Sequence, residues 1–242
     1  MKSAFVLSLF LVVSTLAHGQ VLISLLLGDN LNSGKVEFGL DGGVNFHDIR
    51  GLDAATTKAN FNIGFYFDIK TRNPNWLFHT GVLVKSTVGG ANLPVYSLNN
   101  QDLDNAFANG SVQRKINYFH VPFTMKYKFN KRIFALGGIV PALRSTAFDI
   151  FTADINGDNL EYRNDIKKGI HRLDFGLMGG VGYRLMAGHG MNLTVRYYYG
   201  LVDAIIEDTT PDQYNTSLYL AVGIPIGVGK AQERAAKKAT AQ

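Results

Sequence analysis

The feature that most constrains the fold is a strict alternation of apolar residues with polar or small ones. In "SLYLAVGIPI" (residues 217–226) every second residue is aliphatic, and serine, tyrosine, alanine, glycine and proline lie between. A period of two places successive side chains on opposite faces of a β-strand, whereas a helix repeats every 3.6 residues. The pattern therefore predicts eight strands of about ten residues: 36–46, 59–69, 76–86, 118–129, 133–143, 172–184, 192–201 and 217–226.

The face opposite the aliphatic one indicates the environment of these strands. It is rich in glycine and carries isolated charges, unlike the continuous polar surface that a soluble sandwich exposes to water. The lumen of an eight-stranded barrel is just wide enough to be filled by side chains, so glycine makes room there and acids neutralise bases. We predict that the apolar face contacts lipid and that the lumen holds Glu37, Asp41, Asp68, Lys85, Lys126, Lys128, Arg172, Asp174, Arg184 and Arg196.

The connections between the segments alternate in length. The short ones are residues 71–75, 130–131 and 187–190, and the long ones are 47–57, 87–115, 149–169 and about twelve residues from Asp203. All long loops therefore lie at one end, as in outer-membrane barrels with short periplasmic turns. The predicted fold is all-β: an eight-stranded antiparallel up-and-down transmembrane β-barrel with short periplasmic turns and long extracellular loops. An aromatic girdle is expected at Trp76, Tyr127, Phe129, Tyr183, Tyr197 and Tyr199.

The first twenty residues are typical of a secretory signal peptide. Lys2 is followed by an apolar stretch and by small residues at Ala17 and Gly19, which suit signal peptidase. An uncleaved anchor is the alternative, but polar residues interrupt the run before the ~20 residues that a spanning helix needs. We divide the chain into a signal peptide (1–19), a periplasmic N-terminal segment that can form a short helix (20–34), the barrel (35–229) and a basic periplasmic tail (230–242).

Composition excludes several classes of function. The chain has no cysteine, which removes disulfides, thiolate catalysis and a lipoprotein anchor. Its formal charge of +5 lies largely in Lys2 and in the tail, which carries four basic side chains against Glu233. The body between is nearly neutral, so no basic face indicates nucleic acid. The mature chain has no apolar run of about 18 residues, which excludes helical membrane spans.

Two stretches carry a family resemblance. The sequence "LISLLLGDNLNSGKVEFGLDGGVNF" (residues 22–46) and the "GxxGGVGY" type of strand at residues 176–183 resemble the PorT-like outer-membrane β-barrel proteins of Bacteroidota, which are small barrels of the porin or OmpA-like kind. The resemblance spans about residues 21–229 and implies an outer-membrane location, but no substrate and no catalytic residue. The chain departs from many such barrels at its C-terminus, where an Ala/Lys-rich tail follows the last strand.

The segment "DINGDNLEYRND" (Asp154–Asp165) suggests a calcium loop. Asp154, Asn156 and Asp158 occupy positions 1, 3 and 5 of such a loop, and Asp165 occupies position 12. Position 6 is Asn159 rather than glycine, and no flanking helix is evident. An ordinary surface loop has the same composition, so both interpretations stay open.

Three histidines and one glycine-rich segment are two further candidates for a functional site. His79, His120 and His171 could approach Asp174 or Asp41 in the lumen, as in a hydrolase triad, but no serine lies in a nucleophile turn. We expect these histidines to fill the barrel through hydrogen bonds. Gly176–Tyr183 resembles a phosphate-binding loop only superficially, because its glycines lie within a strand.

The sequence favours a non-enzymatic, monomeric barrel with a largely filled lumen, with no catalytic, cofactor-binding or metal-binding residue assigned. Its expected partners are outer-membrane lipid, the barrel-insertion machinery, and an extracellular ligand or a periplasmic protein. The loop within residues 87–115 is the expected recognition site. The alternatives are a narrow pore, a membrane-barrel enzyme acting on lipid or peptide, and a soluble secreted barrel that carries a ligand.

Overall fold

The computed structural model describes residues 31–52, 55–155, 157–186, 190–207 and 211–227. The predicted signal peptide, most of the N-terminal segment and the tail lie outside these residues. The elements are β1 (Val36–Arg50), β2 (Lys58–Lys70), β3 (Trp76–Val88), α3 (Gln101–Phe107), β4 (Ser111–His120), β5 (Phe123–Lys128), β6 (Ile133–Ile155), β7 (Asp158–Asp165), the 3-10 helix η2 (Lys167–Gly169), β8 (Leu173–Arg184), β9 (Asn192–Asp203) and β10 (Tyr214–Pro225). Within the described residues, no helix is long and apolar enough to cross a bilayer.

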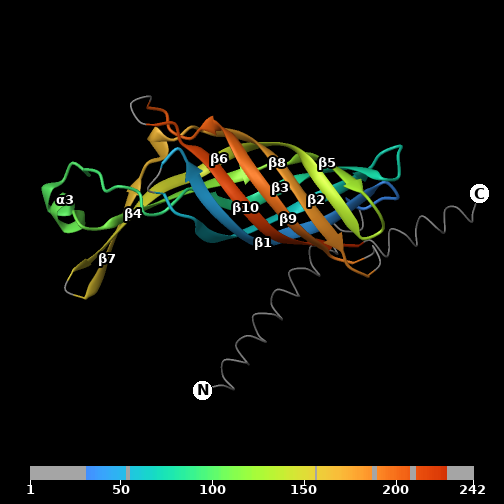
Figure 1. Cartoon of the computed structure of the whole chain (residues 1–242), viewed down its shortest axis with the longest axis horizontal. Coiled ribbons are helices and arrows are strands. Elements are labelled where there is room, and N and C mark those ends of the chain that lie inside the picture. The colour runs from blue at the N-terminus through green and yellow to red at the C-terminus, as the bar shows by residue number, and fades with distance from the viewer. Residues whose placement is uncertain (1–30, 53–54, 156, 187–189, 208–210, 228–242) are drawn as a thin grey trace, which may run out of the picture.

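The strands form a closed antiparallel barrel (Figure 1). Each strand pairs with its neighbours in the ring, and β1 pairs with β10 from Gly39 opposite Pro225 to Arg50 opposite Tyr214. β4 and β5 together occupy one position between β3 and β6, so the ring has eight positions. The eight-stranded up-and-down barrel is therefore confirmed.

The two faces of the strands lie as the alternation predicts. Phe61 and Val181 point outward and are 52% and 58% exposed, whereas Asn45 and Tyr219 point inward and are fully buried. An outward apolar surface and a polar interior are the arrangement of a membrane barrel. A soluble carrier would need the reverse, with the apolar face enclosing its ligand.

The predicted fourth strand is two strands. β4 ends at His120 and β5 begins at Phe123, with Val121 and Pro122 between. Proline has no N–H to donate to a ladder, so regular pairing is interrupted at this point. β4 also begins at Ser111 rather than at Tyr118, so the loop after β3 is shorter than the sequence suggests and contains α3.

The predicted loop at 149–169 is mostly a β-hairpin. β6 continues to Ile155, and β7 pairs back along it from Asp158 opposite Ile155 to Asp165 opposite Phe148. β4 pairs with the other edge of β6 up to Ser111 opposite Thr152. Figure 1 shows α3, β7 and the adjoining part of β4 projecting from one end of the barrel. We call this projection, with the chain between β3 and β4, the cap.

A β-bulge in β3 places one residue that the sequence predicts in the lumen on the outer face instead. Ile63 pairs with Lys85, but the next residue, Gly64, pairs with Leu83. The extra residue, Val84, shifts the alternation, so Lys85 lies on the exposed face and Ser86 points inward. Arg172 is also exposed, because it precedes the first residue of β8.

The aromatic girdle is partly as predicted. At the end with short turns, the ring centroids of Trp76 and Tyr127 lie 4.9 Å apart, and those of Tyr127 and Phe129 lie 5.1 Å apart. Tyr197, by contrast, lies at mid-strand, opposite Gly179 and Leu218. The girdle is therefore clearest at the end with the short turns.

Two adjacent glycines of β6 differ in how closely the neighbouring strand approaches them. A Cβ on inward Gly138 would lie 2.2 Å from the carbonyl oxygen of Phe123, whereas one on outward Gly137 would meet only the Met178 oxygen at 3.8 Å. We expect Gly138→Ala to lower the free energy of unfolding by about 1–3 kcal/mol through overpacking. Gly137→Ala should change it by less than about 0.5 kcal/mol. Urea titration in lipid vesicles, followed by Trp76 fluorescence, measures both effects, and equal effects would contradict this difference in packing.

Candidate functional site

A buried charge cluster occupies the lumen near the short turns. Asp68 on β2 accepts a hydrogen bond of 2.5 Å from Lys126 Nζ on β5, and its other oxygen lies 2.6 Å from Nδ1 of His79 on β3. All three side chains are at most 7% exposed. A carboxylate removed from water needs such partners, because an unpaired buried charge is strongly destabilising.

Two more ion pairs lie beside this cluster. Arg184 Nη2 lies 2.6 Å from Glu37 Oε2, and the Tyr66 hydroxyl donates to Glu37 Oε1 at 3.1 Å. Arg196 holds Asp41 through two contacts of 2.7 and 3.0 Å. The space left among Asp41, Tyr66, His79, Lys126 and Arg196 is a cavity of about 10 Å³, which is roughly the room of one water molecule.

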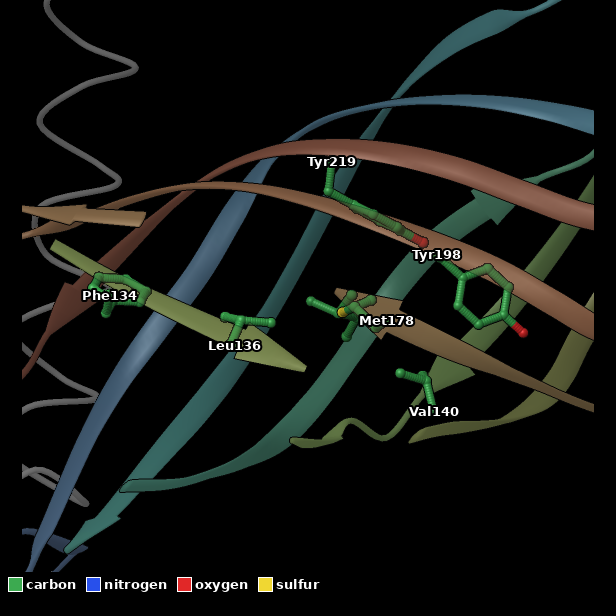
Figure 2. Close-up of a cluster of buried hydrophobic side chains, with 7 residues drawn as sticks. Phe134, Leu136, Val140, Met178, Tyr198 and Tyr219 are labelled. Atoms are coloured by element: carbon green, nitrogen blue, oxygen red, sulfur yellow. The ribbon is translucent and has the colours of Figure 1, made fainter. Parts of the chain in front are cut away.

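The middle of the lumen is apolar, which the sequence did not predict. Figure 2 shows side chains from four strands that converge there: Phe134, Leu136, Val140, Met178, Tyr198 and Tyr219, with Leu83 in the same cluster. β6 supplies the first three because its inward face is apolar as well as its outward face. Because both faces of β6 are apolar, the alternation alone does not show which face of this strand points inward. The lumen is therefore filled by a hydrophobic layer above the ion pairs, not by charges alone.

His120 is enclosed by aromatic rings. It is fully buried, and its ring lies 5.2 Å from Tyr198 and 5.8 Å from Tyr118, centroid to centroid. Neither ring nitrogen has a hydrogen-bond partner among the described residues. The expectation that His120 fills the barrel is confirmed, but it does so by packing rather than by hydrogen bonding.

Polar contacts close the lumen again towards the long loops. His47 lies 2.6 Å from the Gly89 carbonyl oxygen and 2.7 Å from the Asn60 amide. Asn45 donates to the Thr87 carbonyl at 2.8 Å, and Tyr219 and Ser86 share a hydroxyl contact of 2.8 Å. These contacts tie β1 and β10 to β3 across the barrel, so the interior is cross-linked through its centre.

The cap, at the long-loop end of the barrel, has its own hydrophobic core. Ile49, Leu93, Phe107, Val112 and Phe151 form a buried cluster that joins β1, α3, β4 and β6. Beside it, Arg114 makes two contacts with Asp149 at 2.8 and 2.9 Å and donates to Gln213 at 2.7 Å. The cap is thus anchored to the barrel by apolar burial and by a buried ion pair.

Local contacts also order the chain that enters α3. The Asn100 side chain accepts hydrogen bonds from the amides of Asp102 and Leu103, which caps the helix. Asp104 accepts from the Ser97 hydroxyl and the Leu98 amide, and these bonds lower the pKa of its carboxyl. Burial and the nearby Asp149 raise the pKa of Tyr96 to about 12. The loop is therefore structured and not a flexible tether.

The histidines do not form a triad. His79 contacts Asp68 rather than Asp174 or Asp41, His120 lies among aromatic rings, and His171 is exposed. Asp174 instead accepts a hydrogen bond from Asn215 at 3.0 Å. The structure therefore brings together no acid, base and nucleophile from this set.

The positions of the described residues contradict the interpretation of Asp154–Asp165 as a calcium loop. Asp154 and Asp158 flank the tip of the β6–β7 hairpin, whereas Asp165 lies at its other end, opposite Phe148. Carboxylates spread along a strand cannot converge on one ion. Among the described residues, no three His, Asp or Glu side chains are grouped to hold a metal. Gly176–Tyr183 lies within β8, as expected, and so is not a phosphate-binding loop.

Comparison with known proteins gives the family. The outer membrane protein beta-barrel domain matches residues 28–205, which is most of the chain. This chain belongs to that family. The barrel is therefore an outer-membrane β-barrel, in agreement with the outward apolar face. No curated protein sequence matches this barrel significantly.

Solved structures resemble the barrel in fold. The attachment invasion locus protein Ail of Yersinia pestis is 10% identical with a TM-score of 0.44, over 79% of this chain and 99% of Ail. Neisserial surface protein A is 10% identical with a TM-score of 0.40, over 77% of this chain and 96% of that protein. The toluene transporter TodX of Pseudomonas putida is 7% identical with a TM-score of 0.24, over 85% and 93%. At these values the likeness carries no functional argument.

The Asp68 cluster gives a prediction for stability. We expect Lys126→Met to lower the free energy of unfolding by about 3–5 kcal/mol, because Asp68 stays buried with one cation removed. The double variant Lys126→Met/Asp68→Asn should lose less than the sum of the two single variants. Lys58→Met, at an exposed position, is the control. Urea titration in vesicles measures the free energy of unfolding of Lys126→Met, Asp68→Asn, the double variant and the control. Additive losses would contradict the coupling between Lys126 and Asp68.

His120 gives a second prediction. Because its ring nitrogens have no polar partner among the described residues, His120→Phe should change the free energy of unfolding by less than about 1.5 kcal/mol. His120→Ala should lower it by about 2–4 kcal/mol through a cavity. Urea titration in vesicles compares the free energies of unfolding of the two variants. A loss with phenylalanine as large as with alanine would show that the imidazole nitrogens matter.

Proposed function

We propose that the protein is a non-conducting, non-enzymatic recognition barrel of the outer membrane. The barrel anchors it in lipid, the filled lumen stiffens it, and the cap presents a recognition surface outside the cell. The observation that carries this proposal is closure of the lumen at three levels: the ion pairs, the apolar layer of Figure 2 and the core of the cap. A solute would have to displace packed side chains at each level.

The shape of the cap supports a role in recognition. The β6–β7 hairpin and α3 extend past the barrel instead of ending in short turns (Figure 1). Leu160 and Tyr162 of β7 are exposed there, and Tyr96 of the loop before α3 is partly exposed. Exposed aromatic side chains on a rigid support are favoured at binding surfaces, because little conformational entropy is lost when they bind. The cap includes the loop that the sequence already indicated.

The remaining features of the proposal come from the sequence. Residues 1–19 direct export as a signal peptide, and the alternation of loop lengths places both ends of the barrel in the periplasm. The resemblance to PorT-like barrels suggests a source among the Bacteroidota. We take the protein to be a monomer that the barrel-insertion machinery inserts, with an extracellular ligand at the cap.

Two measurements on the purified barrel test this function. In planar bilayers we expect no ion conductance, because the lumen has no continuous opening. A panel of immobilised glycans and surface proteins tests the cap, by comparing the native barrel with a variant in which residues 94–109 become a short Gly/Ser linker. Lys131→Gln, at the opposite end, is the control. Ion conductance by the native barrel would overturn the proposal, and so would ligand binding that persists in the variant without residues 94–109.

A further inference from the structure

A basic hollow lies at the extracellular rim of the barrel, apart from the cap core. It has a volume of about 700 Å³ and is lined by Arg144, Asp165, Lys167, Lys168, Ile170, Arg172 and Ile206. Four of these side chains are cationic and one is a carboxylate. Lys167, Lys168 and Arg172 are exposed and form no ion pair within the described residues. The hollow therefore has positive charge that the described part of the protein does not neutralise.

The backbone around the hollow is held in place by the fold. The guanidinium of Arg144 donates to the carbonyls of Lys167 and Ile170, which fixes η2 against β6. The amide of Ile206 donates to the Gly169 carbonyl at 3.0 Å, so the segment after β9 joins the same unit. Arg144 thus has a structural role, and the other three cations remain available to a ligand.

The height of the hollow matches the surface of the membrane. Leu143 pairs with Leu173 across β6 and β8, and both point outward, with exposures of 39% and 65%. Arg144 and Arg172 are the next residues towards the outside, and the Arg144 amide donates to the Arg172 carbonyl at 2.8 Å. Cations one residue beyond lipid-facing leucines lie at the depth of lipid headgroups.

A second depression, which we call the dent, lies further down the lipid-facing surface, across β6, β8 and β9. Gly137 pairs with Gly179, and a Cβ on Gly179 would meet no atom within 4 Å. This depression, of about 420 Å³, is lined by Gly138, Ile139, Leu177, Met178, Gly179, Tyr197 and Tyr199. From Arg172 to Gly179 the strand covers roughly 23 Å, or roughly 18 Å of depth at a tilt of about 40°. That is close to the thickness of one leaflet.

We propose that the hollow and the dent together bind one phosphate-bearing glycolipid of the outer leaflet. Lys167, Lys168 and Arg172 hold its phosphate, and an acyl chain lies in the dent over Gly179. Charge complementarity favours this occupant, because the cations face the layer where lipid phosphates lie. The inference rests on the proposed orientation of the barrel, with the long loops outside.

Binding of bisphosphorylated lipid A to the purified full-length barrel in a neutral detergent, read by native mass spectrometry, tests the headgroup site. We expect Lys167→Gln/Lys168→Gln/Arg172→Gln to weaken binding at least tenfold. Lys70→Gln/Arg72→Gln/Lys131→Gln removes the same charge at the opposite rim and should change binding less than twofold. Equal losses would mean general charge attraction and would overturn the site.

The acyl-chain half has its own test. Gly179→Leu fills the dent without touching the cations and should weaken lipid A binding several-fold. Val181→Leu, at an outward position on the same strand, should leave it unchanged. Dephosphorylated lipid A that binds as tightly as lipid A, or inorganic phosphate that displaces it at millimolar concentration, would overturn the proposal. Membrane fractionation tests the outer-membrane location separately, so failure of lipid binding is distinguishable from failure of that assignment.

Discussion

The pairing of β1 with β10 is the constraint on which the rest of the structure depends. Hydrocarbon offers no hydrogen bonds to a free strand edge, so a sheet that spans a membrane must close on itself. Here the first and last strands pair from Gly39 opposite Pro225 to Arg50 opposite Tyr214. Once the ring closes at eight positions, its narrow lumen can hold little but its own side chains.

The filled lumen follows from that closure. Each carboxylate of the lower lumen meets a cation supplied by another strand: Glu37 meets Arg184, Asp41 meets Arg196 and Asp68 meets Lys126. Above them lies an apolar layer, and above that the polar contacts of His47 and Asn45. Three kinds of packing in one short barrel give it rigidity across its axis as well as around it.

The two ends of the barrel differ because only one carries extra structure. At one end the turns are short, and Trp76, Tyr127 and Phe129 form an aromatic cluster. At the other end β6 extends beyond the barrel, and β4, β7 and α3 pack on this extension. Our two proposals therefore assign different regions of this end to different ligands: the cap to an outside partner and the basic hollow around η2 to lipid headgroups.

The sequence by itself determined the number of membrane-facing segments, the lipid-facing side of most of them and the end that carries the long loops. These depend on the period of two and on loop length, which are local properties. The tertiary structure decided that β6 and β7 form a hairpin, that the bulge at Val84 turns Lys85 outward and that His79 contacts Asp68. Those outcomes depend on cross-strand register and on long-range packing. A single residue of slip reverses every side chain beyond it, so alternation alone cannot fix them.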